Sequence, residues 1–162
     1  MSGSDGGVYV ESTIIMTTVR AVAPFVFTFG LFVMFHGAES AGGGFQGGAL
    51  VAAAVLLLAF TFGIESTRAW LASALVRTAI AGGGAAFAII GLATVALDGA
   101  FLEYVAYGYG STGTKYGIEL VELGIGAVVS GVLVGLFFSL AGGDFEPALG
   151  GDAEAETGGE ES

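Results

Sequence analysis

Four long apolar runs constrain the fold of this chain more than any other feature of its sequence. They cover residues 14–35, 49–64, 76–97 and 116–140. About 20 apolar residues let a helix cross the hydrocarbon core of a bilayer. Hydrophobic residues make up 54% of the chain and charged residues only 12%, too few for the surface of a soluble domain. The sequence therefore predicts an all-α integral membrane protein with four transmembrane helices.

Composition divides the chain into three segments. A polar segment over residues 1–13 precedes a transmembrane domain over residues 14–141, and an acidic tail over residues 142–162 follows it. Seven of the 15 acidic residues lie in that tail, which has no apolar periodicity, so we expect it to be disordered. Such a tail is typical of proteins from high-salt cells, and its charge argues against nucleic acid and anionic headgroups as partners of the tail.

The basic residues predict an orientation in the cell membrane. Arg68 and Arg77 lie between the second and third apolar runs, and Arg20 lies near the start of the first. Because basic loops stay on the cytoplasmic side, we expect both termini of this multi-pass chain in the cytoplasm. Lys115, before the fourth run, is then the one basic residue outside.

A glycine-rich segment over residues 35–48, named the hinge below, separates the first two apolar runs. Glycine disfavours a helix but permits close backbone approach, so we expect a tight, non-helical turn here. Residues 42–47 also satisfy the pattern G-x-G-x-x-G. No short strand precedes them and no βαβ unit surrounds them, which argues against a dinucleotide site.

Neither a catalytic site nor a cofactor or metal site is predicted. The chain has no cysteine, which excludes thiolate ligands, and its single histidine, His36, argues against most zinc and haem sites. Nothing resembles a P-loop or a nucleophile elbow. We therefore expect a protein without enzymatic activity.

Two carboxylates in the fourth apolar run are candidates for ion transport. A charged Glu119 or Glu122 inside a membrane costs several kcal/mol unless it is paired, hydrated or protonated. At about 100° per residue, Lys115 shares a helix face with both, so it could neutralise one carboxylate and leave the other to titrate. The three residues fit a proton or cation relay, or a polar group that reaches water and anchors the helix end.

The opposite face of the same run carries small residues, among them Gly124, Gly131 and Gly135. Small residues let the backbones of two membrane helices approach closely. We expect this face to pack against another helix.

Arg20 and His36 each allow two interpretations. Arg20 pairs with a carboxylate in the membrane, such as Glu119 or Glu122 or one from a partner, or it extends to water at the cytoplasmic boundary. His36, at the end of the first run, is a proton carrier or a polar anchor at the interface. Both remain candidates for the ion path.

The hinge resembles a motif of a known family. Its characteristic residues are His36, Gly37, Gly42, Gly43, Gly44, Phe45, Gly47 and Gly48. This pattern is similar to that of the B subunit (MnhB-like) of Mrp/Mnh-type multisubunit sodium/proton antiporters, and related subunits occur in membrane-bound hydrogenases. Residues 116–129 also resemble that family's last span. Ala38 and Ala41 stand where the family often has histidine and proline.

The resemblance implies a non-catalytic subunit of a sodium/proton antiporter that helps the complex assemble and contributes to the ion path. Glu119 and Glu122 are the best candidates to contact a transported cation or proton. The expected partners are other membrane subunits, the transported sodium and protons, and the lipid bilayer. Two alternatives stay open: a structural subunit in the membrane arm of a hydrogenase or respiratory-type oxidoreductase, and a standalone homodimeric transporter.

Overall fold

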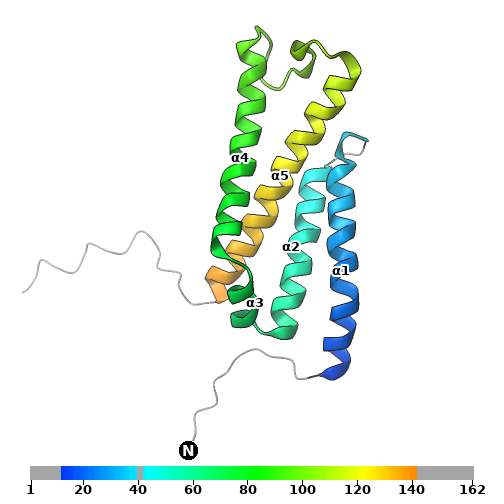
Figure 1. Cartoon of the computed structure of the whole chain (residues 1–162), viewed down its shortest axis with the longest axis vertical. Coiled ribbons are helices and arrows are strands. Elements are labelled where there is room, and N and C mark those ends of the chain that lie inside the picture. Colours follow the sequence, from blue (N-terminus) through cyan, green and yellow to red (C-terminus); the bar gives the residue numbers. More distant parts are fainter. Residues whose placement is uncertain (1–11, 40–41, 142–162) are drawn as a thin grey trace, which may run out of the picture.

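The computed structural model describes residues 12–39 and 42–141, so the acidic tail and most of the polar N-terminal segment lie outside the described residues. The α-helices are α1 (Thr13–Phe35), α2 (Gly43–Phe62), α3 (Ile64–Trp70), α4 (Ser73–Ala96) and α5 (Gly110–Ala141) (Figure 1). Two short 3₁₀ helices, η1 (Gly37–Glu39) and η2 (Tyr104–Tyr107), lie in the connections.

Within the described residues, four helices, α1, α2, α4 and α5, are long and apolar enough to cross a membrane. The prediction of an all-α, multi-pass membrane protein with four spans is therefore confirmed. The longest, α5, has 32 residues and is about 48 Å long at about 1.5 Å per residue. Because the hydrocarbon core is about 30 Å thick, α5 must tilt or extend beyond it.

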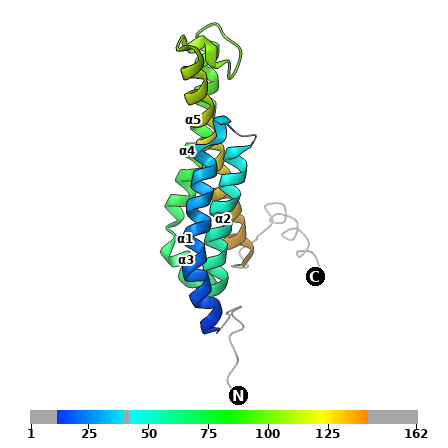
Figure 2. The same ribbon diagram turned by 90° about the vertical axis from the view of Figure 1, so that its right-hand side faces the viewer.

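The long helices form a row in the order α1, α2, α5, α4. α2 packs against α1 on one side and α5 on the other, and α4 packs against α5. Figure 2 shows this row nearly edge-on. Large apolar side chains such as Phe25 and Phe29 on α1, and Ile89 and Leu92 on α4, are exposed. In a membrane these surfaces contact lipid or neighbouring helices.

Glycines allow the helices of the row to approach closely. A Cβ atom on Gly48 of α2 would lie 2.6 Å from the carbonyl oxygen of Gly126 on α5. A Cβ atom on Gly83 of α4 would lie 2.4 Å from the carbonyl oxygen of Gly124 on α5. Both distances are too short for any side chain, so both interfaces of α5 require glycine on the facing helix.

The prediction of a non-helical hinge is wrong for the second half of the hinge. Residues 43–48 form the first turns of α2, which begins after Gly42 in the left-handed conformation (φ 83°). Packing overrides helix propensity here, because a Cβ atom on Gly44 would lie 2.3 Å from the backbone oxygen of Glu122 on α5. Of the described hinge residues before α2, His36 and Gly42 are non-helical and Gly37–Glu39 form η1.

The helix bounds differ from the apolar runs. α5 begins at Gly110 rather than Tyr116, because the helix continues through polar residues beyond its apolar part. The Thr114 hydroxyl, for example, donates to the carbonyl oxygen of Gly110 at 3.2 Å. The polar interruption after α2 contains the short helix α3, which begins after Gly63 (φ 99°).

The two ends of the row carry different residues and connections. The start of α1, the end of α5 and the whole of α3 lie at one end, named the α3 end below (Figure 1). The turn between α1 and α2 lies toward the other end, which carries the connection from α4 to α5 and is named the hinge end. Lys115 lies toward the hinge end, whereas Arg68 belongs to α3 itself.

Candidate functional site

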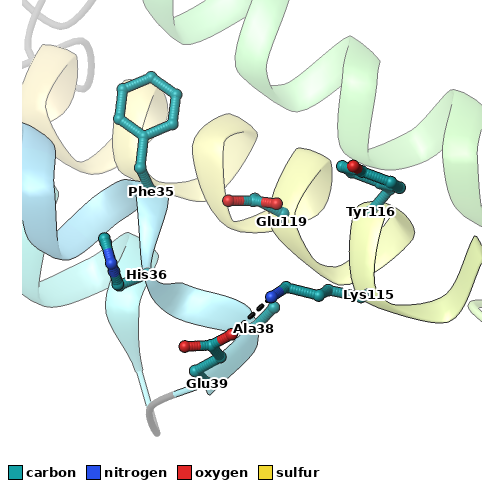
Figure 3. Close-up of a pocket in the computed structure, with 7 residues that line it drawn as sticks. All are labelled: Phe35, His36, Ala38, Glu39, Lys115, Tyr116 and Glu119. Atoms are coloured by element: carbon teal, nitrogen blue, oxygen red, sulfur yellow. Dashed lines mark hydrogen bonds and ion pairs between the residues drawn. The ribbon is translucent and has the colours of Figure 1, made fainter. Parts of the chain in front are cut away.

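A pocket of about 310 Å³ lies where the end of α1 and η1 meet the early turns of α5 (Figure 3). Its lining residues are Phe35, His36, Ala38, Glu39, Lys115, Tyr116 and Glu119. Three of the predicted ion-path residues, His36, Lys115 and Glu119, therefore line one pocket although they come from two distant parts of the chain. The fold joins the hinge to the polar face of α5.

An ion pair crosses this pocket. Lys115 Nζ donates a hydrogen bond to Glu39 Oε1 at 2.5 Å, and both side chains are more than half exposed (52% and 62%). The hydrogen bond and the positive charge of Lys115 lower the pKa of the Glu39 carboxyl below its usual value, and His36 adds a smaller effect in the same direction. Because water screens both charges, the pair adds little stability.

The expected pairing of Lys115 with Glu119 or Glu122 is wrong. The turn of η1 brings the Glu39 carboxylate to Lys115, and this carboxylate takes the hydrogen bond. Sequence reasoning missed Glu39 as a site residue. One signal for this pair was available in the sequence. With four alternating spans, the acid in the hinge and the lysine before the fourth apolar run lie on the same side of the membrane.

Glu122 follows Glu119 by one helical turn and is directed at the hinge. Its Oε2 atom is shielded from solvent and has no hydrogen-bond partner among the residues that the structure describes. A Cβ atom on Gly37 would lie 1.0 Å from this oxygen, and a Cβ atom on Gly43 would lie 2.8 Å from it. Gly37, Gly43 and Gly44, named the hinge glycines below, thus leave the space that the Glu122 carboxyl group and its backbone occupy.

His36 is fixed at the end of α1. Its Nδ1 atom donates to the carbonyl oxygen of Phe32 at 3.0 Å, and the two rings lie 4.1 Å apart between centroids. The Nδ1 bond orients the imidazole at the pocket. Phe45, another residue of the hinge motif, is 62% exposed on the first turn of α2.

The three glycines expected to form a packing face on α5 lie against α4 of the same chain. These residues are Gly124, Gly131 and Gly135, and their nearest α4 neighbours are respectively the Gly83 backbone, the Ile80 side chain and the Val76 side chain. A Cβ atom on Gly131 would lie 2.7 Å from Ile80. This face therefore belongs to an interface within the chain.

The residues of this site lie in a part of the chain that is similar to known proteins. The profile of a family described as "Domain related to MnhB subunit of Na+/H+ antiporter" matches residues 14–135. The chain belongs to this MnhB-related family. A relative from Staphylococcus haemolyticus (strain JCSC1435), assigned by its name as antiporter subunit mnhB2, is 30% identical over 140 residues. That alignment covers 82% of this chain and 97% of the relative.

The matched residues of this MnhB-related chain include the whole candidate site. The hinge, the pocket and Glu122 all fall within residues 14–135, whereas the acidic tail lies beyond them. The resemblance read from the hinge motif is thereby confirmed.

Arg20 lies far from this site. The Cζ atom of its guanidinium group lies 5.2 Å from the centroid of the Phe62 ring, in a cation–π arrangement at the α3 end. The alternative in which Arg20 pairs with Glu119 or Glu122 of this chain is wrong, because the end of α2 holds Arg20 at the opposite end of the row (Figure 1).

Proposed function

We propose that this chain is a non-catalytic membrane subunit of a multisubunit sodium/proton antiporter, where it supports assembly and contributes to the ion path. Its membership of the MnhB-related family supports the proposal, as does the relative whose name designates an antiporter subunit. The open row of helices supports a role within a larger assembly, because both faces of the row are available to neighbouring helices.

One observation carries the proposed role in the ion path: Glu122 Oε2, beside the hinge glycines, is shielded and has no hydrogen-bond partner in the described part of the chain. An ionised carboxylate without a partner in a membrane protein costs several kcal/mol. The group is therefore stable when it carries a proton or when it contacts a cation. A single carboxylate can hold a proton or a cation, but not both together. Each exchange of one for the other therefore couples the movement of protons in one direction to the movement of cations in the opposite direction.

The pocket provides a route from the aqueous phase toward Glu122. Glu39 neutralises Lys115 at the pocket, so Glu119 leaves the lining with a net negative charge when His36 is neutral. A negative lining raises the local concentration of cations and protons. Glu119 lies one turn before Glu122 on the same helix, and in this proposal it passes a proton or a cation between the pocket and the Glu122 carboxyl group.

The proposed orientation has both termini and the α3 end in the cytoplasm. The start of α1 and the end of α5 lie at the same end of the row as α3, which carries Arg68 (Figure 1). Arg77 lies near the start of α4, at that same end. The pocket would then open toward the outside, the source of the protons that enter in exchange for sodium.

Purification from native membranes tests the assignment to a complex. The tagged full chain should co-purify with further membrane subunits of an antiporter, identified by mass, and the chain expressed alone should show no antiport. Co-purification with hydrogenase or quinone-oxidoreductase subunits would instead support the structural alternative. Antiport by the chain alone would contradict the proposed subunit role.

A further inference from the structure

A second groove, of about 370 Å³, lies between α1 and α2 and extends to α3. Its walls include Phe27 of α1 and Leu58 of α2. Two lining alanines, Ala23 and Ala54, are almost completely buried (3% and 2% exposed). The side chains that fill the space between the two helices are therefore small here. The groove is a largely apolar depression on the outer surface of the helix row.

Arg20 and Trp70 also line this groove. The Arg20 side chain is exposed and is held at the end of α2 by its contact with the Phe62 ring. Within residues 12–39 and 42–141, no carboxylate forms an ion pair with it. Its guanidinium donors are therefore available to an anion, and the planar fork of arginine matches the oxygens of a phosphate group.

We propose that this groove binds an anionic phospholipid, with an acyl chain between α1 and α2 and the phosphate at Arg20. Trp70 is 73% exposed on α3, and tryptophan prefers the level of the headgroups. Arg20 contacts the last residue of α2 and so lies at this same level, below which the apolar walls begin. The site thus pairs a cation at headgroup level with an apolar channel at acyl-chain depth.

Charge favours an anionic lipid over a zwitterionic one. Within residues 12–39 and 42–141, three arginines toward the α3 end, Arg20, Arg68 and Arg77, outnumber the one carboxylate there, Glu65. Anionic lipids collect near such basic groups. A helix from a partner subunit is the competing occupant, and it would have to bring a carboxylate to Arg20.

Trp70 is the only tryptophan of the chain and reports directly on this groove. The full chain would be reconstituted in phosphatidylcholine vesicles with increasing fractions of lipid brominated on the acyl chain, which quenches indole fluorescence on contact. Brominated phosphatidylglycerol should quench Trp70 with an apparent affinity about fivefold higher than that of brominated phosphatidylcholine. This is the difference in affinity expected from the attraction between one arginine and an anionic lipid.

Three variants separate the lipid site from general membrane contact. Arg20→Gln should abolish the preference for phosphatidylglycerol, whereas Arg20→Lys, which keeps the charge, should retain most of it. Arg77→Gln removes a positive charge at the α3 end outside the groove, and it should reduce the preference much less than Arg20→Gln does. Circular dichroism of each variant verifies that the helices are intact.

Equal quenching by the two lipids in the unmodified chain would overturn the proposal. So would a preference that persists in Arg20→Gln. The competing occupant has its own test, because the chain has no cysteine. A Leu58→Cys variant in the assembled complex should react with a lipid-soluble maleimide, whereas cross-linking of this cysteine to another subunit would show a protein in the groove and contradict the inference. None of these results depends on the proposed ion path.

Discussion

Gly37 and Glu122 lie so close together that any side chain at the first position would displace the Glu122 carboxyl group. A Cβ atom on Gly37 would lie 1.0 Å from Glu122 Oε2, and Gly37 is itself buried. This contact joins the turn after α1 to the polar face of α5. It gives the glycine at this point of the family motif a physical role, which is to leave room for a carboxyl group.

Gly37→Ala should therefore destabilise the protein by displacing Glu122. Overpacking of a buried position costs about 1–3 kcal/mol, and here the clash is with a single side chain. Thermal unfolding in detergent measures the change. In a Glu122→Ala background the same substitution should cost much less, because the clashing carboxyl group is gone. An equal loss in both backgrounds would show that Gly37 does not act through Glu122.

Two neighbouring glycines of α4 provide a matched test of the helix packing. A Cβ atom on Gly83 would lie 2.4 Å from the carbonyl oxygen of Gly124, whereas a Cβ atom on Gly84 would meet no atom within 4 Å. Gly83→Ala should push α4 away from α5 and lower the stability by about 1–3 kcal/mol. Gly84→Ala should leave the melting temperature unchanged or slightly higher, since alanine favours a helix. Equal effects of the two substitutions would contradict the described interface.

The ion pair between Lys115 and Glu39 should respond to pH and to salt. The pKa of Glu39 is lowered in the folded protein, so the contribution of the pair to the stability of the fold is fully present above the ordinary glutamate pKa of about 4.3. It is lost as the pH falls through the lowered value, because protonated Glu39 has no charge to pair. Lys115→Gln should thus reduce stability slightly at neutral pH, and the difference should vanish in acid.

Salt provides the control for this small effect. Both side chains are exposed, so raising the ionic strength should shrink the difference between Lys115→Gln and the unmodified chain at neutral pH. A difference that is the same at every pH and salt concentration would mean that Lys115 acts by packing rather than by charge.

The four spans and their order along the chain could be predicted from hydropathy, because each backbone that crosses a membrane must satisfy its own hydrogen bonds in a helix. The arrangement of the spans as a row could not. Apolar side chains on a membrane helix face lipid as readily as they face another helix, so exposed Phe25 and buried Val134 give the same signal in the sequence.

The candidate site was only partly predictable for a related reason. Glu119 and Glu122 are conspicuous because charge is rare in a membrane span. The position of Lys115 on the same helix face follows from the period of the helix. Glu39 and the hinge glycines depend on how the turn after α1 packs on α5, which no local pattern of residues specifies. The density of glycine in the hinge predicts the absence of a helix, whereas residues 43–48 are helical and close packing requires glycine there.

The proposed ion path requires the Glu122 carboxyl group to take part in ion exchange, and sodium-dependent proton flux in everted vesicles tests this requirement. The assembled complex with Glu122→Gln should lose most of its antiport while keeping its subunits, since an amide holds the same space but cannot exchange a proton for a cation. Glu119→Gln should reduce antiport in the same way. Glu65→Gln, which neutralises an exposed carboxylate at the α3 end, should leave it unchanged. Normal flux in both Glu119→Gln and Glu122→Gln complexes would contradict a role of these carboxyl groups in the ion path.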